Sequence, residues 1–189
     1  MSRGTAIAIA IAVLACVAPG GVATAATSRA AAGACANAGS IAVDDATRAQ
    51  AIEAVRCLIN VERAGRGLRA LRASGLLKNA ATGHSAEMVA RQFLSHTSAN
   101  GDSVDRRALR SGYARKTRRW VLGETLTWGT GTFASPTQLV IALMRSGAHR
   151  RTILDRRFLD IGVGMVLGAP MSGMTGGRAA TVTVNFGRR

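Results

Sequence analysis

The sequence of 189 residues contains few aromatic side chains and only three prolines. Phe, Trp and Tyr make up 4% of it, so alanine and aliphatic residues must supply most of any core. Because 48% of the residues are nevertheless hydrophobic, we expect a folded domain and exclude disorder over most of the chain. The length suits one domain together with a processing segment.

Acidic residues are also scarce, since 10 Asp and Glu stand against 25 Lys and Arg, for a formal net charge of +15. Of the basic residues, only Lys78 and Lys116 are lysines. Such a surface attracts anionic partners, for example cell-envelope polymers or lipid headgroups, although a merely solvated surface has the same composition. The basic residues are not interleaved with aromatic ones, so the sequence predicts no specific nucleic-acid partner.

No apolar run reaches the roughly 20 residues that a membrane-spanning helix needs. The N-terminus has a charged start at Arg3, an apolar stretch over residues 5–17 and a small-residue exit at Ala23-Thr24-Ala25. This pattern is typical of a secretory signal peptide. We therefore expect residues 1–25 to be removed, leaving a secreted protein, extracellular or in the cell envelope, with no transmembrane segment. Val13 to Cys16 loosely resembles a lipoprotein cleavage box, which leaves lipidation of Cys16 as an alternative.

Cysteine is limited to three residues, and one of these, Cys16, belongs to the predicted signal peptide. An even pair in an exported protein implies a disulfide, so we predict a bridge between Cys35 and Cys57. The bridge would tie an N-terminal arm, residues 26–45, to the first helix of a domain over residues 46–189. In the chain-entropy model it would stabilise the fold by roughly 3 kcal/mol.

Apolar periodicity and capping residues predict four helices and three strands. The first helix is capped by Asp44 or Asp45 and runs to about Arg66, and His84 lies on the apolar face of the second, where we expect a hydrogen-bonded core histidine. The order of elements predicts an α+β fold in which helices cover a small antiparallel sheet. The remaining helices are expected at 74–92, 104–111 and 136–146, and the strands at 120–128, 161–167 and 181–186.

Several short motifs occur in an order that is specific as a set, although each is weak alone. Together they resemble the bacterial branch of the CAP superfamily, which comprises cysteine-rich secretory, antigen 5 and pathogenesis-related 1 proteins. The motifs that carry the resemblance are Asn60-Val61-Glu62-Arg63, Gly67-Leu68-Arg69-Ala70-Leu71, His84-Ser85-Ala86-Glu87-Met88, Ser95-His96, Gly123-Glu124-Thr125, His149-Arg150-Arg151-Thr152-Ile153-Leu154, Ile161-Gly162-Val163-Gly164 and Asn185-Phe186-Gly187.

The resemblance implies a three-layer α/β/α sandwich with a cleft in which two histidines and acidic residues can bind a divalent metal. Matched by motif, the cleft residues are His96, Glu124 and His149, and a further acidic position of the family falls at or near Ser146. His96 and His149 are then the metal ligands, with zinc as the candidate ion and no cofactor required. Glu124 is either a third ligand or a residue that holds a histidine in place.

The sequence favours a non-enzymatic extracellular module that binds a small ligand, a lipid, a metal or a partner through His96, Glu124, Ser146 and His149. One alternative is a metal-dependent hydrolase of peptide or cell-wall material, with Glu124 as general base. The other is a basic module that holds anionic envelope polymers by charge. We assign no catalytic residue, because no nucleophile elbow or oxyanion loop accompanies Ser146.

Overall fold

The structure, a computed structural model, describes residues 35–114, 119–173 and 178–189. The predicted signal peptide with Cys16, and the first part of the expected N-terminal arm, lie outside these residues. Within the described ranges, no helix combines the length and the apolar character needed to cross a membrane.

Polar residues that the sequence places before each apolar run start most of the helices. Asp44, rather than Asp45, begins the first helix through a capping box with Thr47. Ser74, Ser103 and Ser146 each accept a backbone N–H of the first turn that follows them. The helices are α2 (Asp45–Ala64), α3 (Gly75–Arg91), α4 (Val104–Arg110), α5 (Pro136–Arg145) and α6 (Gly147–Ile153), and a 3-10 turn, η1 (Gly131–Ala134), precedes α5.

Four strands form one sheet in the order β1-β3-β4-β2. The two pairings that involve β4 are antiparallel, as predicted, whereas β1 adds a parallel edge to β3. Strand β1 was not predicted, because a strand of two residues shows no periodicity in the sequence. The strands are β1 (Arg72–Ala73), β2 (Val121–Thr130), β3 (Asp160–Leu167) and β4 (Ala179–Arg188).

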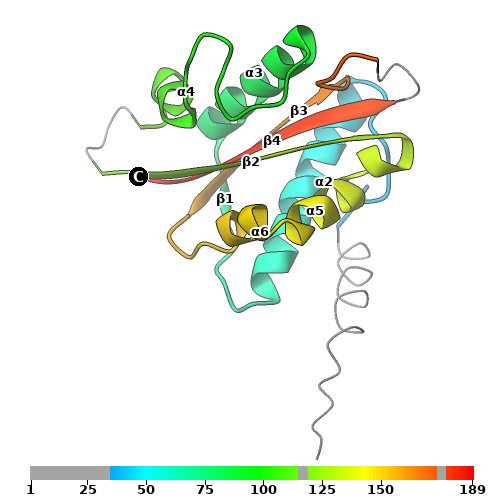
Figure 1. The fold of residues 1–189 in the computed structure, drawn as a ribbon. Coiled ribbons are helices and arrows are strands. Elements are labelled where there is room, and N and C mark those ends of the chain that lie inside the picture. The colour runs from blue at the N-terminus through cyan, green and yellow to red at the C-terminus, as the bar shows by residue number, and fades with distance from the viewer. Residues whose placement is uncertain (1–34, 115–118, 174–177) are drawn as a thin grey trace, which may run out of the picture.

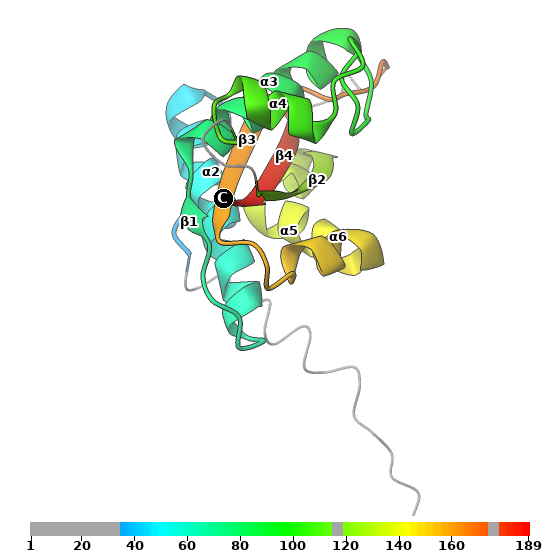
Figure 2. The same ribbon diagram turned by 90° about the vertical axis from the view of Figure 1, so that its left-hand side faces the viewer.

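The sheet lies between two layers of helices, which confirms the predicted sandwich. Helices α3 and α4 cover one face, and α2, α5 and α6 lie against the other (Figures 1 and 2). The main core fills the second interface, where apolar side chains of α2 and α5 meet β3 and β4. The predicted Cys35–Cys57 disulfide is present and attaches the residues ahead of α2 to this core.

On the other face, α3 lies unusually close to β3. Gly162 and Gly164 face this helix, and a Cβ atom at either position would overlap backbone atoms of Lys78 or Thr82. Direct contact between the two backbones therefore sets the height of α3 above the sheet. This contact also sets the position of His84, which belongs to α3 and contacts the loop before α4.

The helix α6 was missed in the sequence, where only its histidine motif was recognised. Ser146 ends α5 and at the same time caps α6, so the chain turns there into a second short helix. Arg63 of α2, only 1% exposed, donates hydrogen bonds to the carbonyl oxygens of Ile153 (2.7 Å) and Asp155 (3.0 Å). The resemblance motif around Arg63 thus holds the C-terminal end of α6 in place.

Candidate functional site

Glu124 of β2 is the centre of the predicted cleft, yet its side chain is only 2% exposed. Its Oε1 atom lies 2.9 Å from Nδ1 of His96. Its Oε2 atom accepts a 2.7 Å hydrogen bond from Nη2 of Arg107. Both carboxylate oxygens are therefore engaged by neighbouring side chains, and Glu124 holds His96 in one orientation.

His96 lies in the loop between α3 and α4 and presents its ring to solvent, with 59% of the side chain exposed. Because Nδ1 faces Glu124, Nε2 is the ring nitrogen left to contact a ligand. The backbone oxygen of His96 also accepts a 3.0 Å hydrogen bond from Nη2 of Arg107. The residue is thus held through its ring and through its main chain.

His149 lies in the first half of α6 and close enough to His96 for the two rings to influence each other. Burial lowers the pKa of His149, and the nearby His96 lowers it further. His149 is consequently neutral at pH 7, the state in which an imidazole can bind a metal or accept a hydrogen bond. The sequence analysis predicted that both histidines share one cleft, and the influence of His96 on the pKa of His149 is consistent with their lying near each other.

Ser146, the fourth predicted cleft residue, has a structural role in α6. Its hydroxyl oxygen accepts the backbone N–H of His149 at 3.5 Å, which is the N-cap interaction of α6. The imidazole of His149 is not the partner of this hydroxyl in any hydrogen bond of the described residues. The contact between the two residues is therefore a helix cap and not an activated nucleophile.

Arg107 of α4 was missed by the sequence analysis and is the most connected side chain of the site. In addition to Glu124 and His96, it donates from Nη1 to Oγ of Ser98 at 3.1 Å and to the carbonyl oxygen of Asp102 at 2.8 Å. It is only 5% exposed. In the sequence it is one half of an Arg106-Arg107 doublet, and nothing local distinguishes it from its exposed neighbour.

His84 is the hydrogen-bonded core histidine that the sequence predicted. Its Nε2 donates to the carbonyl oxygen of Ser95 at 2.8 Å, and its Nδ1 accepts from Oγ of Ser98 at 3.3 Å. Burial lowers its pKa, and the cation of Arg107 lowers it further. A neutral His84 thereby holds the loop on both sides of His96.

The predicted cleft residues provide only part of a metal-binding site. Across the described part of the chain, no group of three or more His, Cys, Asp and Glu side chains is arranged to hold a metal ion. Glu124, which the sequence left as either a ligand or a positioning residue, is hydrogen-bonded to His96 and paired with Arg107. The imidazoles of His96 and His149 are the groups that remain for an ion.

The sandwich of one sheet between two layers of helices defines the class of α/β/α domain to which the chain belongs, and comparison with known proteins agrees. The CAP family, described as the cysteine-rich secretory protein family, matches residues 57–186. The chain therefore belongs to the CAP family. No curated protein matches the sequence.

Solved structures show the same fold at low sequence identity. An extracellular protein containing an SCP domain from Bacillus anthracis has a TM-score of 0.61 and 20% identity, over 78% of this chain and 45% of that one. An outer surface protein of Borrelia burgdorferi has a TM-score of 0.57 and 18% identity, over 71% and 90%. A cysteine-rich secretory protein of Staphylococcus aureus has a TM-score of 0.55 and 15% identity, over 75% and 40%. The chain thus spans less than half the length of the first and third of these proteins.

Proposed function

We propose that this protein is a non-enzymatic extracellular binding module whose ligand contacts the imidazoles of His96 and His149. The observation that carries the proposal is the engagement of both carboxylate oxygens of Glu124, by His96 and by Arg107. This arrangement makes Glu124 a residue that orients His96. It leaves the outer edge of the His96 ring as the accessible polar group.

The same observation argues against the alternative of a hydrolase with Glu124 as general base. A general base must come within hydrogen-bond distance of the water or substrate from which it takes a proton. Glu124 is almost fully buried, and its two carboxylate oxygens are already engaged by Arg107 and His96. The carboxylate would have to leave both partners before it could accept a proton.

An extracellular location is supported from two directions. The first is the N-terminal pattern of charge, apolar core and small residues over residues 1–25, which predicts export. The second is the family, together with the names of similar structures, one called extracellular and another an outer surface protein. An exported protein would also be oxidised, in agreement with the disulfide between Cys35 and Cys57.

Zinc is the simplest probe of the two imidazoles, and it is also the ion suggested by the family resemblance. His96 and His149 would hold it, and the bound ion would supply a Lewis-acidic contact for an oxygen or nitrogen atom of a further ligand. With two protein ligands, the site would be weaker than a closed structural zinc site. The fold should survive chelation, because its core and disulfide are independent of any metal.

Calorimetric titration of the disulfide-bonded protein with zinc tests the proposal. We expect saturable binding at pH 7.5 that weakens strongly at pH 5.5, because imidazole binds a metal only in its neutral form. His96→Ala and His149→Ala should each remove most of the affinity, whereas His84→Gln should reduce stability and leave affinity nearly unchanged. Zinc binding that is the same in both cleft variants and in the wild type would reject the imidazole pair as the binding element.

Two further assays separate the remaining alternatives. Turnover of peptide or cell-wall material that is sensitive to chelators and abolished by Glu124→Gln would establish the hydrolase instead. Binding to anionic envelope polymers that falls steeply with salt and ignores both cleft substitutions would establish the charge-based module. The binding module predicts neither result.

A further inference from the structure

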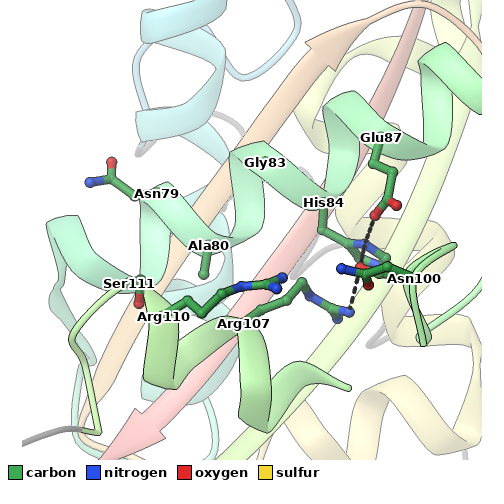
Figure 3. A pocket seen from close by; sticks show the side chains of 10 residues that line it. Asn79, Ala80, Gly83, His84, Glu87, Asn100, Arg107, Arg110 and Ser111 are labelled. Atoms are coloured by element: carbon green, nitrogen blue, oxygen red, sulfur yellow. Dashed lines mark hydrogen bonds and ion pairs between the residues drawn. The ribbon is translucent and has the colours of Figure 1, made fainter. Parts of the chain in front are cut away.

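A cavity of about 430 Å³ lies between α3 and α4. None of the four predicted cleft residues is among those that line it. Its wall includes Gly83 and His84 of α3 together with Arg107 and Arg110 of α4 (Figure 3). The volume lies within the range of about 300–1,000 Å³ that is common for pockets of small ligands.

Gly83 is the first sign that this space is more than a packing defect. It lies in the interior of α3, where glycine is among the least favourable residues. The contact between α3 and β3 explains glycines elsewhere, but a Cβ atom at Gly83 would meet no other atom within 4 Å. Packing therefore does not require glycine at this position, and its absent side chain leaves the wall of the cavity open.

The side chain of Arg110 supplies a cation at the edge of this cavity. It is 60% exposed, and within the described residues its ion pair joins Nη1 to Asp102 and leaves its other N–H groups available. In Figure 3 the side chain of Arg110 extends from α4 along the side of α3 that carries Ala80, whereas that of Arg107 extends toward Asn100. A planar guanidinium with free N–H groups matches the paired oxygens of a carboxylate or a phosphate.

The other polar groups of the wall favour a ligand rich in acceptor oxygens. The Nε–H group of Arg107 is buried and has no acceptor among the described residues. The carboxylate of Glu87, the acidic side chain of the wall, is already engaged by the backbone N–H of Ala99 at 3.0 Å. The exposed donors that remain for a ligand are therefore those of Arg110, whose Nη1 also pairs with Asp102.

We propose that the cavity between α3 and α4 binds a small oxyanion, namely the carboxylate or phosphate group of a compact organic anion. The anion lies against the open surface at Gly83 and is held by the guanidinium of Arg110. Arg107 forms the deeper wall and also contacts Glu124 and His96, so this site and the histidine cleft share one buried side chain. The proposal goes beyond the binding function assigned to the cleft and depends on different residues.

Titration of the isotopically labelled, disulfide-bonded protein, followed by NMR, tests the proposal. The probes are inorganic phosphate, glycerol 3-phosphate and glucuronate, each added at constant ionic strength so that general screening does not change. We expect saturable shifts of the amides of Ala99, Asn100 and Ser111, which lie in or next to the wall. A tighter response to glycerol 3-phosphate assigns the site to phosphate esters, and a tighter response to glucuronate assigns it to carboxylates.

Two substitutions and their matched controls decide where the anion binds. Arg110→Ala should weaken binding by about tenfold or more, because it removes a charged hydrogen-bonding group. Gly83→Leu should abolish binding by filling the open space. Arg91→Ala removes the same charge from the exposed end of α3, and Gly75→Leu adds the same side chain at another uncrowded glycine; both should bind like the wild type.

Three results would overturn the proposal. The first is the absence of saturable shifts with all three probes. The second is unchanged binding in Arg110→Ala and Gly83→Leu. The third is an equal loss in Arg91→Ala, which would mean attraction by diffuse surface charge. His96→Ala and His149→Ala serve as a further control and should bind the anions like the wild type. The result of this test therefore does not depend on the function proposed for the cleft.

Discussion

Arg107 and Glu124 form a buried ion pair, in which Nη2 of the guanidinium lies 2.7 Å from Oε2 of the carboxylate and the side chains are 5% and 2% exposed. Removing two charges from water is costly, and other groups satisfy the remaining polar atoms of the pair except Nε of Arg107, which has no acceptor among the described residues. His96 contacts the second carboxylate oxygen, while Ser98 and Asp102 accept hydrogen bonds from the guanidinium. The loop that carries His96 is thus built around this pair.

Removing one member of the pair should therefore cost much of the stability of the fold. We expect Arg107→Ala to lower the free energy of unfolding by about 3–5 kcal/mol, because a buried carboxylate is left without its partner. Denaturant melts measure the change. The control is Arg106→Ala, an exposed neighbour, which should change the free energy by less than about 0.5 kcal/mol. Equal effects of the two substitutions would contradict a central role for Arg107.

The buried His84 should make the fold less stable in mild acid. Its pKa is lowered in the folded state, chiefly by burial, so the unfolded chain takes up a proton first as the pH falls. Stability should be complete above the unfolded pKa of about 6.5 and decline as the pH falls from there toward the lower folded value. In His84→Gln the decline between pH 7 and pH 5 should be smaller. His149→Gln, measured in parallel, accounts for the second histidine whose pKa is lowered. A slope unchanged by the loss of His84 would show that its burial is not linked to protonation.

The contact between α3 and β3 should tolerate no added carbon atom at Gly164. A Cβ atom there would overlap the backbone of Thr82, so Gly164→Ala must push the helix away from the sheet. Overpacking of this kind costs about 1–3 kcal/mol. Gly83→Ala is the matched control, because its Cβ atom meets no neighbour and alanine favours a helix over glycine by about 1 kcal/mol. Thermal melts should move in opposite directions for the two variants, and a shift in the same direction would contradict the packing described for α3.

The two layers of helices should contribute separately to the core. Leu58 of α2 and Met88 of α3 are 3% and 0% exposed. Truncation of either to alanine should destabilise the protein by roughly 2–5 kcal/mol through lost burial and a cavity. Denaturant melts decide the matter, and a loss below about 0.5 kcal/mol, as for a surface residue, would contradict the packing of that helix.

The elements that were predicted correctly are those with strong local patterns. Local sequence patterns located α3 and α4 to within about two residues. The short helix α6 and the strand β1 escaped notice because neither is long enough to show a period. Their positions depend on distant contacts, such as those between Arg63 and the carbonyl groups of Ile153 and Asp155.

In the candidate site, too, residues within local motifs could be predicted, whereas contacts between distant parts of the chain could not. The family motifs pointed to His96, Glu124 and His149; in the structure His96 contacts Glu124, and His96 influences the pKa of His149. The sequence did not show that Arg107 would pair with Glu124, because the contact joins α4 to β2 across an intervening loop and depends on burial. The role proposed for Glu124, which is to orient His96, rests on this contact.

The bridge between Cys35 and Cys57 also determines how the domain carries mechanical load. A pull applied to the chain ahead of Cys35 passes through the covalent bond directly into the middle of α2, so the residues between the two cysteines bear no tension. Ala38 lies between the two cysteines, and its carbonyl oxygen accepts a 2.9 Å hydrogen bond from the backbone N–H of Thr137 in α5. In a domain held to a surface through its N-terminal end, the contact with the start of α5 would therefore persist under tension. Without the disulfide, the same force would pull the residues ahead of α2 off the core.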